Sequence, residues 1–190
     1  MTDTPNQPLK VPGPWVRPIA RIFHNGRPAI AQWAIYIAQH KRTTTPMHYA
    51  ETRPIPVPPN RNFRLEWANE RPVTTDCSGF AVICTDLAGV NVDPTRNVWD
   101  GAGNSTEFFT NPANKRLNIS QIKPGDFAVY GPEGDEHIVV IVRAGRSPLV
   151  CSHGEEGDPS IYPLSVDTRT PRTFIRVNAF ARRVNFPHKD

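Results

Sequence analysis

Cysteine is scarce in this sequence. Cys77, Cys84 and Cys151 are present among 190 residues, and no two of them form a Cys-x-x-Cys pair. An odd number without such a pair argues against a disulfide framework and against a zinc ribbon or finger. This usage suits a protein that is made in a reducing compartment.

Long apolar runs are also missing. No stretch approaches the roughly 18 residues of a membrane-spanning helix. The first ten residues, MTDTPNQPLK, lack the basic segment and following apolar segment of a secretory signal. We therefore expect no membrane span, and synthesis in the cytoplasm without a signal peptide. If the protein acts outside a cell, another route must deliver it.

The basic charge has no aromatic side chains interleaved with it. The net charge is +4, and residues 166–190 contain six Lys or Arg against Asp167 and Asp190. A basic segment can bind nucleic acid or an anionic envelope polymer, or it can simply face water. Without the aromatic pattern we expect no nucleic-acid partner, and a solvated surface is favoured.

Proline, by contrast, is abundant and uneven. Eleven of the 21 prolines lie in the first 60 residues. We predict that residues 1–28 form a proline-rich extended arm. Residues 29–190 are then one domain, long enough to bury an ordinary hydrophobic core.

Hydrophobic spacing predicts helices early in the chain and strands late. Apolar residues recur at helical spacing within residues 29–42. A second helix is expected to begin after Thr75 or Asp76, either of which is a good N-cap. Its apolar stripe consists of Phe80, Ile83, Cys84 and Leu87.

Four later segments are typical of strands, and 91–118 has no clear pattern. The strands are expected within residues 123–131, 137–145, 147–154 and 173–184. Helices followed by an antiparallel meander predict the α+β class.

Cys77 is the first residue of the second predicted helix. The free N–H groups and the dipole at a helix start favour an anion, and they can lower the pKa of a thiol. The residues alone support a nucleophile and a buried core residue about equally. Cys84 lies on the apolar stripe and Cys151 within a strand, so both are predicted to belong to the core.

A cysteine nucleophile needs a base, and the base needs an orienting partner. Of the six histidines, His24, His40 and His188 are expected in solvent. His137 begins the strongest predicted strand and His153 lies near the end of the next. Antiparallel pairing can bring these two positions side by side.

Four segments occur in an informative order. They are TTDCSGF (74–80), IKPGDFAVYG (122–131), HIVVIV (137–142) and VCSHG (150–154). In these motifs the chain resembles the NlpC/P60 family of cysteine peptidases. The resemblance implies a papain-like fold in which the helix that carries the cysteine packs on an antiparallel sheet.

The resemblance also implies roles for individual residues. Cys77 would be the nucleophile, His137 the general base and His153 the residue that orients it. Tyr49 is the nearest match to a family tyrosine beside the oxyanion site, although the usual Gly-Gly after it is missing. His48 is a weaker rival. Candidates for the oxyanion or substrate side of the site are Tyr49, Asp76 and Ser78. No cofactor or metal is expected.

The implied substrate is bacterial peptidoglycan. Family members typically cut its stem peptides, often between D-γ-glutamyl and diaminopimelate residues. Six acidic residues flank the two histidines, and they could receive an ammonium group or simply be solvated: Glu133, Asp135, Glu136, Glu155, Glu156 and Asp158.

Several alternatives stay open from sequence. One is an amidase of the CHAP type or an acyl transfer on the cell wall. Others are a non-catalytic wall-binding module of a virion, and a metal site built from Cys77, His137 and His153. The absent signal and the arm favour a bacteriophage protein. Such a protein would be an endolysin released at lysis or part of a virion tail, with tail proteins as partners of the arm.

Overall fold

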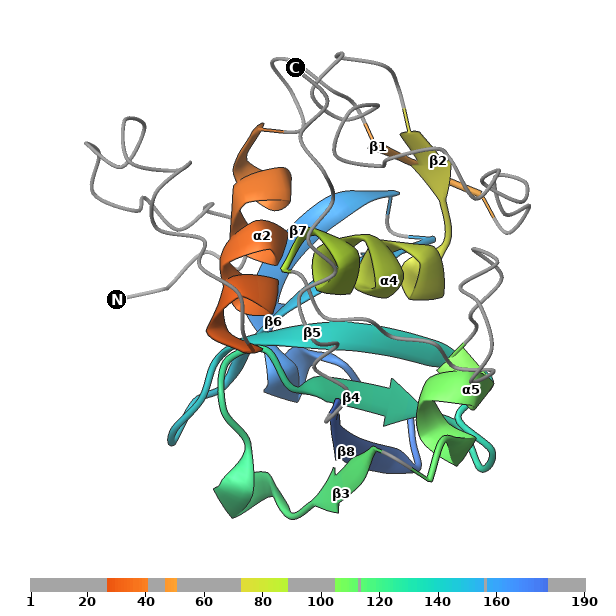
Figure 1. Cartoon of the computed structure of the whole chain (residues 1–190), viewed down its shortest axis with the longest axis vertical. Helices are drawn as coiled ribbons and strands as arrows, with labels where there is room; N and C mark the ends of the chain where they lie inside the picture. The colour runs from red at the N-terminus through yellow and green to blue at the C-terminus, as the bar shows by residue number, and fades with distance from the viewer. Residues whose placement is uncertain are drawn as a thin grey trace, which may run out of the picture.

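The computed structural model describes residues 27–40, 47–50, 73–88, 105–112, 114–155 and 157–177 (Figure 1). Most of the predicted arm, residues 1–26, lies outside the described residues. The remaining two, Arg27 and Pro28, begin the first described helix.

The described helices include both of those predicted. Helix α2 runs over Arg27–His40 and α4 over Cys77–Leu87. The short helix α5, Ser105–Thr110, falls in a region whose pattern predicted nothing. Two 3-10 turns, η1 at Ile119–Gln121 and η2 at Leu164–Val166, complete the helical elements of the described part.

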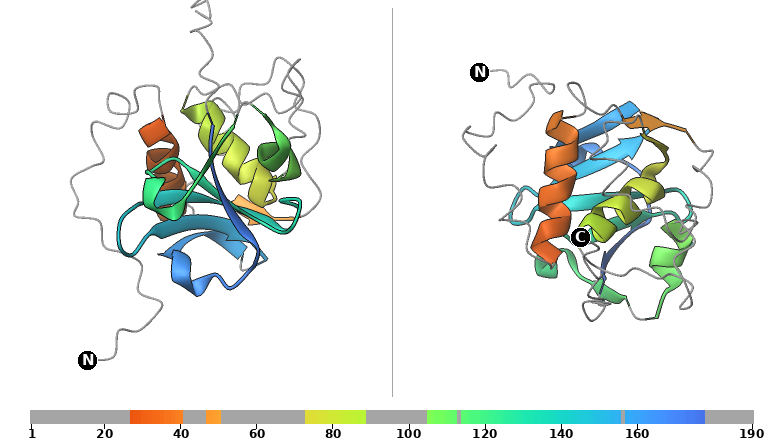
Figure 2. Two further views of the ribbon diagram at one scale, coloured as in Figure 1. Left: turned by 90° about the horizontal axis from the view of Figure 1, so that it is seen from below. Right: turned by 45° about the horizontal axis from the view of Figure 1, so that its top comes forward.

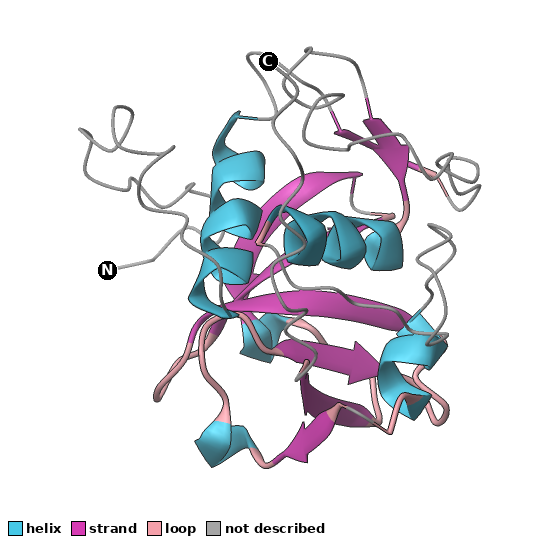
Figure 3. Ribbon diagram, viewed as in Figure 1, coloured by secondary structure: helices cyan, strands magenta, loops and turns pink. Residues whose placement is uncertain are grey.

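Six strands form one antiparallel sheet in the order β3-β8-β4-β5-β6-β7. Their bounds are Lys115–Leu117 for β3, Phe127–Tyr130 for β4, His137–Arg143 for β5, Leu149–Gly154 for β6, Gly157–Pro163 for β7 and Arg172–Arg176 for β8. Strands β4, β5 and β6 form the predicted meander, but β7 was not predicted, and the predicted last strand is β8, which returns to lie between β3 and β4. The α+β class is confirmed (Figure 3).

A second sheet of two short strands was not predicted. Strand β1, Met47–Tyr49, pairs in parallel with β2, Val73–Thr75. Its register sets Tyr49 opposite Thr75, two residues before the start of α4. This pairing connects the segment after the first helix to the segment that leads into Cys77.

The large sheet has a hydrophobic core on each face. Helices α2 and α4 cover one face, as both views in Figure 2 show, and alternate strand residues such as Ile138, Val140 and Cys151 pack beneath them. The other face carries residues of opposite parity, among them Val139 and Val150, and is covered in part by Leu164 of η2. Alternation along a strand therefore decides which layer each side chain joins.

Cys84 of α4 and Cys151 of β6 are fully buried in the core between the helices and the sheet, as predicted. The thiol of Cys151 also reaches the carbonyl oxygen of Ala34 in α2 at 3.5 Å. Within the described part of the chain, no helix is long and apolar enough to span a bilayer.

The Pro-Gly-Asp turn before β4 has a structural explanation. Gly125 has φ +89°, and a Cβ there would lie 1.9 Å from the carbonyl oxygen of Arg27, so the turn packs against the start of α2. Asp126 is fully buried. Its carboxylate accepts the amide of Lys123 at 2.7 Å and two hydrogen bonds from Arg176 at 2.6 and 2.7 Å. The turn therefore joins α2, β4 and β8.

Candidate active site

Asp76 is the N-cap of α4. Its Oδ1 accepts a hydrogen bond from the amide of Gly79 at 2.6 Å and one from the hydroxyl of Ser78 at 2.7 Å. Bonding from the cap side chain to the third helical amide is the usual N-cap arrangement. Of the two predicted caps, Asp76 is therefore the one used, and it fixes Cys77 as the first residue of the helix.

Gly79 leaves room for the chain that enters the helix. A Cβ at this position would lie 1.9 Å from Oγ1 of Thr75. The absence of a side chain lets Thr75, which is itself buried, pack against the first turn of α4. The Asp-Cys-Ser-Gly motif thus combines a cap, a cysteine at the helix start, a second donor to the cap and a close approach of the backbone.

The sulfur of Cys77 lies against the start of β5. Its thiol interacts with the backbone amide of Ile138, the residue after His137, and the side chain is only 9 % exposed. In β5 the amide of Ile141 points to the β4 side, where it donates to the backbone carbonyl of Asp126, the residue before β4. Amides alternate in direction along a strand, so that of Ile138 points towards β6. Cys77 thus occupies the position of a β6 partner.

The gap that receives this sulfur follows from the strand register. The β5–β6 pairs run from Arg143–Leu149 to Val140–Cys151. The first three residues of β5 lie beyond the last of these pairs. Here Cys77 approaches β5 from the helix layer. Its sulfur contacts the strand one residue after His137.

The Cys77 thiol is protonated at neutral pH in this environment. Burial raises its pKa to about 11, and the charge of Asp76 adds to the increase. The amides of Ile138, Ser78 and Cys77 itself act in the opposite direction. The amides at the helix start lower this pKa as expected, but the loss of solvent outweighs them, so the net change is an increase.

His137 has a side-chain partner on the neighbouring strand. Its Nε2 lies 2.8 Å from the hydroxyl oxygen of Ser152, and both residues are buried. His137 also faces Tyr130, its cross-strand neighbour on β4, with ring centroids 6.0 Å apart. By strand alternation, these three residues share the face of the sheet opposite α4.

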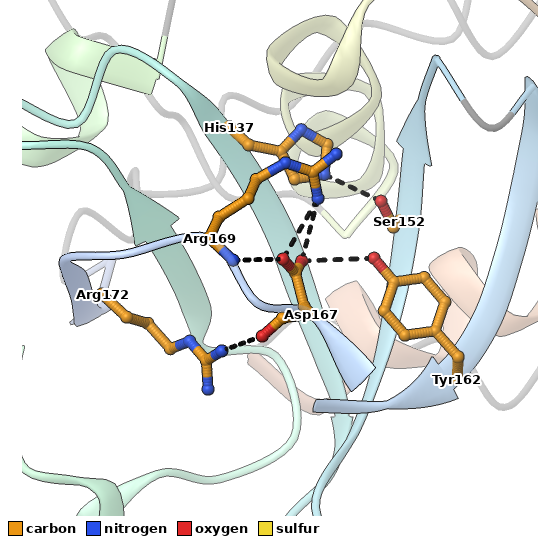
Figure 4. Close-up of polar contacts among 6 residues, drawn as sticks. All are labelled: His137, Ser152, Tyr162, Asp167, Arg169 and Arg172. Carbon is orange, nitrogen blue, oxygen red and sulfur yellow. Dashed lines mark hydrogen bonds and ion pairs between the residues drawn. The ribbon is translucent and has the colours of Figure 1, made fainter. Parts of the chain in front are cut away.

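A polar network fixes the segment that crosses this face (Figure 4). The buried carboxylate of Asp167 pairs with Arg169 at 3.1 Å and accepts a bond from the hydroxyl of Tyr162 at 3.4 Å. Its backbone carbonyl accepts a bond from Arg172, whose guanidinium lies 5.1 Å from the centre of the Tyr130 ring. The connection from β7 to β8 is therefore held on the side of the sheet from which His137 projects.

His153 lies on the other face and has backbone partners. Its Nδ1 is 3.0 Å from the carbonyl oxygen of Gly157, and its Nε2 is 3.0 Å from that of Thr75. The ring also packs against Phe80 of α4 at a centroid distance of 5.9 Å. These contacts tie the end of β6 to the chain entering α4, and they do not place His153 as the orienting partner of His137.

The remaining candidates lie near the helix start to different degrees. Tyr49 packs edge-on against the ring of His153, with centroids 5.6 Å apart, and is opposite Thr75 in the small sheet. His48 points to solvent. Tyr49 is thus close to the segment that positions Cys77.

Five of the six acidic residues lie within the described part of the chain. Glu133, Asp135 and Glu136 are exposed before β5 and Glu155 is exposed after β6, whereas Asp158 is half-buried and Glu156 lies outside the described residues.

Ser152 is the residue that sequence reasoning missed. It stands directly before His153, and in a strand these neighbours must face opposite sides. The sequence contained the relevant signal, because Val150 and Ser152 share one parity and Cys151 and His153 the other. Only the structure shows which of these two sets of residues faces the helices.

A metal site built from Cys77, His137 and His153 requires their ligand atoms to converge. The two histidines instead face Ser152 and backbone carbonyls. Among the residues that the structure describes, no group of three or more His, Cys, Asp or Glu side chains is arranged to hold a metal ion.

A cysteine at a helix start lies beside a strand that begins with histidine, which is the arrangement expected from the resemblance to NlpC/P60 enzymes. The structure is similar to that of the peptidoglycan hydrolase RipB from Mycobacterium tuberculosis, with 17 % identity, a TM-score of 0.43, and coverage of 88 % of this chain and 73 % of that one.

A second similar structure is that of the resuscitation promoting factor interacting protein RipA. The identity is 16 %, the TM-score is 0.41, and the match covers 78 % of this chain and 62 % of the RipA chain. Both proteins are of the NlpC/P60 family, whose motifs this sequence resembles. No family model and no curated protein matches the chain.

Proposed function

We propose that this chain is a peptidoglycan hydrolase, a cysteine endopeptidase that cuts stem-peptide bonds. The observation that carries the proposal is the position of Cys77. Its sulfur lies at the start of α4 and against the amide of Ile138, next to His137. A thiol, a neighbouring imidazole and a set of helix-start amides are the groups that acyl transfer through a thioester requires.

In the proposed reaction His137 is the general base. Its Nδ1 takes the proton of the Cys77 thiol as the sulfur attacks the carbonyl carbon of the scissile amide. The oxyanion that forms is stabilised by amides of the first turn of α4. Collapse of this intermediate breaks the C–N bond, His137 returns the proton to the leaving amine, and a thioester remains on Cys77. Water, deprotonated by His137, then hydrolyses the thioester and frees the thiol.

The raised pKa of Cys77 favours this order of events. A thiol with a pKa of about 11 is rarely ionised at neutral pH, so its proton must be removed as the carbonyl arrives. Asp76 contributes in two ways, because its carboxylate caps the helix and its charge disfavours an unpaired thiolate. Tyr49 is proposed on the substrate side, because it borders the chain that leads to Cys77.

The bond between D-γ-glutamyl and diaminopimelate residues is the proposed point of cleavage, from the resemblance to NlpC/P60 enzymes. The four exposed acidic side chains at 133, 135, 136 and 155 are suited to a free ammonium group of a stem peptide. We further propose that the protein reaches the wall as a phage endolysin or as part of a virion. The alternative reactions, an amidase of the CHAP type and an acyl transfer, would produce different fragments.

The test is digestion of purified peptidoglycan by the wild type, Cys77→Ala and Cys84→Ala, with the fragments identified by mass spectrometry. We expect the wild type to release cut stem peptides and Cys77→Ala to release none. Cys84→Ala removes a buried thiol from the same helix and is expected to retain activity at some cost in stability.

Equal activity of wild type and Cys77→Ala would refute the nucleophile. Fragments cut at the bond between muramic acid and the first stem residue would replace the endopeptidase with an amidase. Activity lost to a chelator and restored by zinc would favour metal chemistry.

A further inference from the structure

Ser152 and His137 form a buried side-chain pair across the open end of the β5–β6 ladder. Ser152 is fully buried, His137 is 3 % exposed, and the hydroxyl oxygen lies 2.8 Å from Nε2. This distance is that of a well-formed hydrogen bond. The pair therefore fixes the imidazole at the start of β5, one residue before the amide that the Cys77 sulfur contacts.

The identity of this partner limits what the imidazole can do. When the ring is neutral, one nitrogen carries a proton and the other an accessible lone pair. If Nε2 donates to the hydroxyl oxygen of Ser152, the lone pair is on Nδ1. This is the nitrogen that the proposed reaction uses as the base towards Cys77.

We propose that Ser152 is the positioning residue of the site: its hydroxyl accepts the Nε2 proton of His137 and thereby keeps Nδ1 as the base. The inference rests on the proposed function for its catalytic meaning. It reassigns to Ser152 the orienting role that the family resemblance implied for His153. No proton passes to Ser152 in any step, since Nε2 remains a donor in both the neutral and the charged ring.

A neutral hydroxyl orients the ring without the charge that a carboxylate would add. A carboxylate partner would favour the imidazolium and with it an ion pair with the thiolate. Ser152 fixes the orientation of the imidazole ring and adds no charge. Cys77 and His137 are therefore expected to rest as a thiol and a neutral imidazole, in agreement with the raised pKa of Cys77.

The first test reads the tautomer of His137 directly. Nitrogen-15 NMR of the imidazole distinguishes a ring protonated at Nε2 from one protonated at Nδ1. We expect the Nε2–H form in the wild type, a mixture of the two forms in Ser152→Ala, and the Nε2–H form again in Ser152→Thr, which keeps a hydroxyl. A wild-type ring protonated mainly at Nδ1 would overturn the proposal.

The second test measures catalysis in the same variants. Loss of a buried hydrogen-bond partner predicts that kcat of Ser152→Ala falls about 10–100-fold while KM changes little. Ser152→Thr is expected to recover most of kcat, and it also keeps the proposal testable if the alanine variant folds poorly. An unchanged kcat in Ser152→Ala, together with an unchanged tautomer, would remove Ser152 from the site.

Failure of this inference can be told apart from failure of the proposed function. If the wild type leaves peptidoglycan intact, the function is refuted, whereas the NMR result needs no substrate. The rate of Cys77 alkylation by iodoacetamide gives a second readout without substrate. At neutral pH we expect Ser152→Ala to react more slowly than the wild type, and equal rates would contradict the inference.

Discussion

The start of β5 and the end of β6 each contain a buried histidine, but the two have different partners. His137 lies on the face opposite α4, with the hydroxyl of Ser152 at Nε2. His153 lies beneath α4 with a backbone carbonyl at each ring nitrogen. Carbonyl oxygens only accept hydrogen bonds. The His153 ring therefore links the end of β6 to the chain entering α4. This difference in partners supports the proposal that His137 takes part in the chemistry, whereas His153 connects segments of the fold.

The comparison is tested most strongly by replacing His137. We expect His137→Ala to lower kcat by about 10²–10⁴-fold, because a positioned general base contributes about that much. Peptidoglycan digestion at constant enzyme concentration measures the loss. The matched control is His153→Gln, which is expected to stay within tenfold of the wild type. A larger loss of kcat in the His153 variant than in the His137 variant would reverse the assignment.

Replacing His153 should affect stability first. A neutral ring donates to one carbonyl only, so His153→Phe removes the donor of either the Gly157 or the Thr75 carbonyl, and the latter keeps its bond from the amide of Ala50. We expect the free energy of unfolding to fall by about 2–3 kcal/mol, measured by urea denaturation at pH 7. An unchanged stability together with a steep fall in kcat would mean that His153 takes part in the reaction.

The smallest expected effect concerns the resting state of Cys77. A pKa of about 11 in the folded protein, against an ordinary 9.0, means that the unfolded chain loses this proton first as the pH rises. The associated stability is fully present below pH 9 and is lost between pH 9 and about 11. Relative to Cys77→Ala, the wild type should lose about 2 kcal/mol over this range.

Urea denaturation of both proteins under reducing conditions, at pH 8 and pH 11, measures this difference. Cys84 is common to both and cancels. Parallel pH profiles would mean that folding does not raise the pKa of Cys77, and a wild type that gains stability relative to Cys77→Ala as the pH rises to about 9 would mean that the thiol is already ionised at rest, as in an ion pair with His137. That result would contradict the neutral pair that Ser152 is proposed to maintain.

Local patterns predicted the elements that carry the site. The stripe from Phe80 to Leu87 and the cap at Asp76 mark α4, and the β-branched run after His137 marks β5. Both patterns depend on residues close in sequence. The strands that pair at long range were not predictable in this way. The pairing of β1 with β2 joins residues 26 positions apart, such as Met47 and Val73, and β8 inserts between β3 and β4.

The site itself was predicted less completely than the fold. The motif predicted Cys77 and His137 as site residues, and these stay predictions. Ser152 and His153 exchange places as neighbours of His137 when one strand residue is counted differently. The direction of the Cys77 pKa also depends on burial, which spacing along the chain does not reveal.

The contact between the Cys77 sulfur and the Ile138 amide gives the molecule an internal reporter. This amide points away from β4 and has the thiol in place of a β6 carbonyl. Its proton resonance and its rate of exchange with deuterated water should therefore follow the chemical state of the sulfur. Thiol, thioester and alkylated forms can then be distinguished at one backbone position, without a dye or a chromogenic substrate.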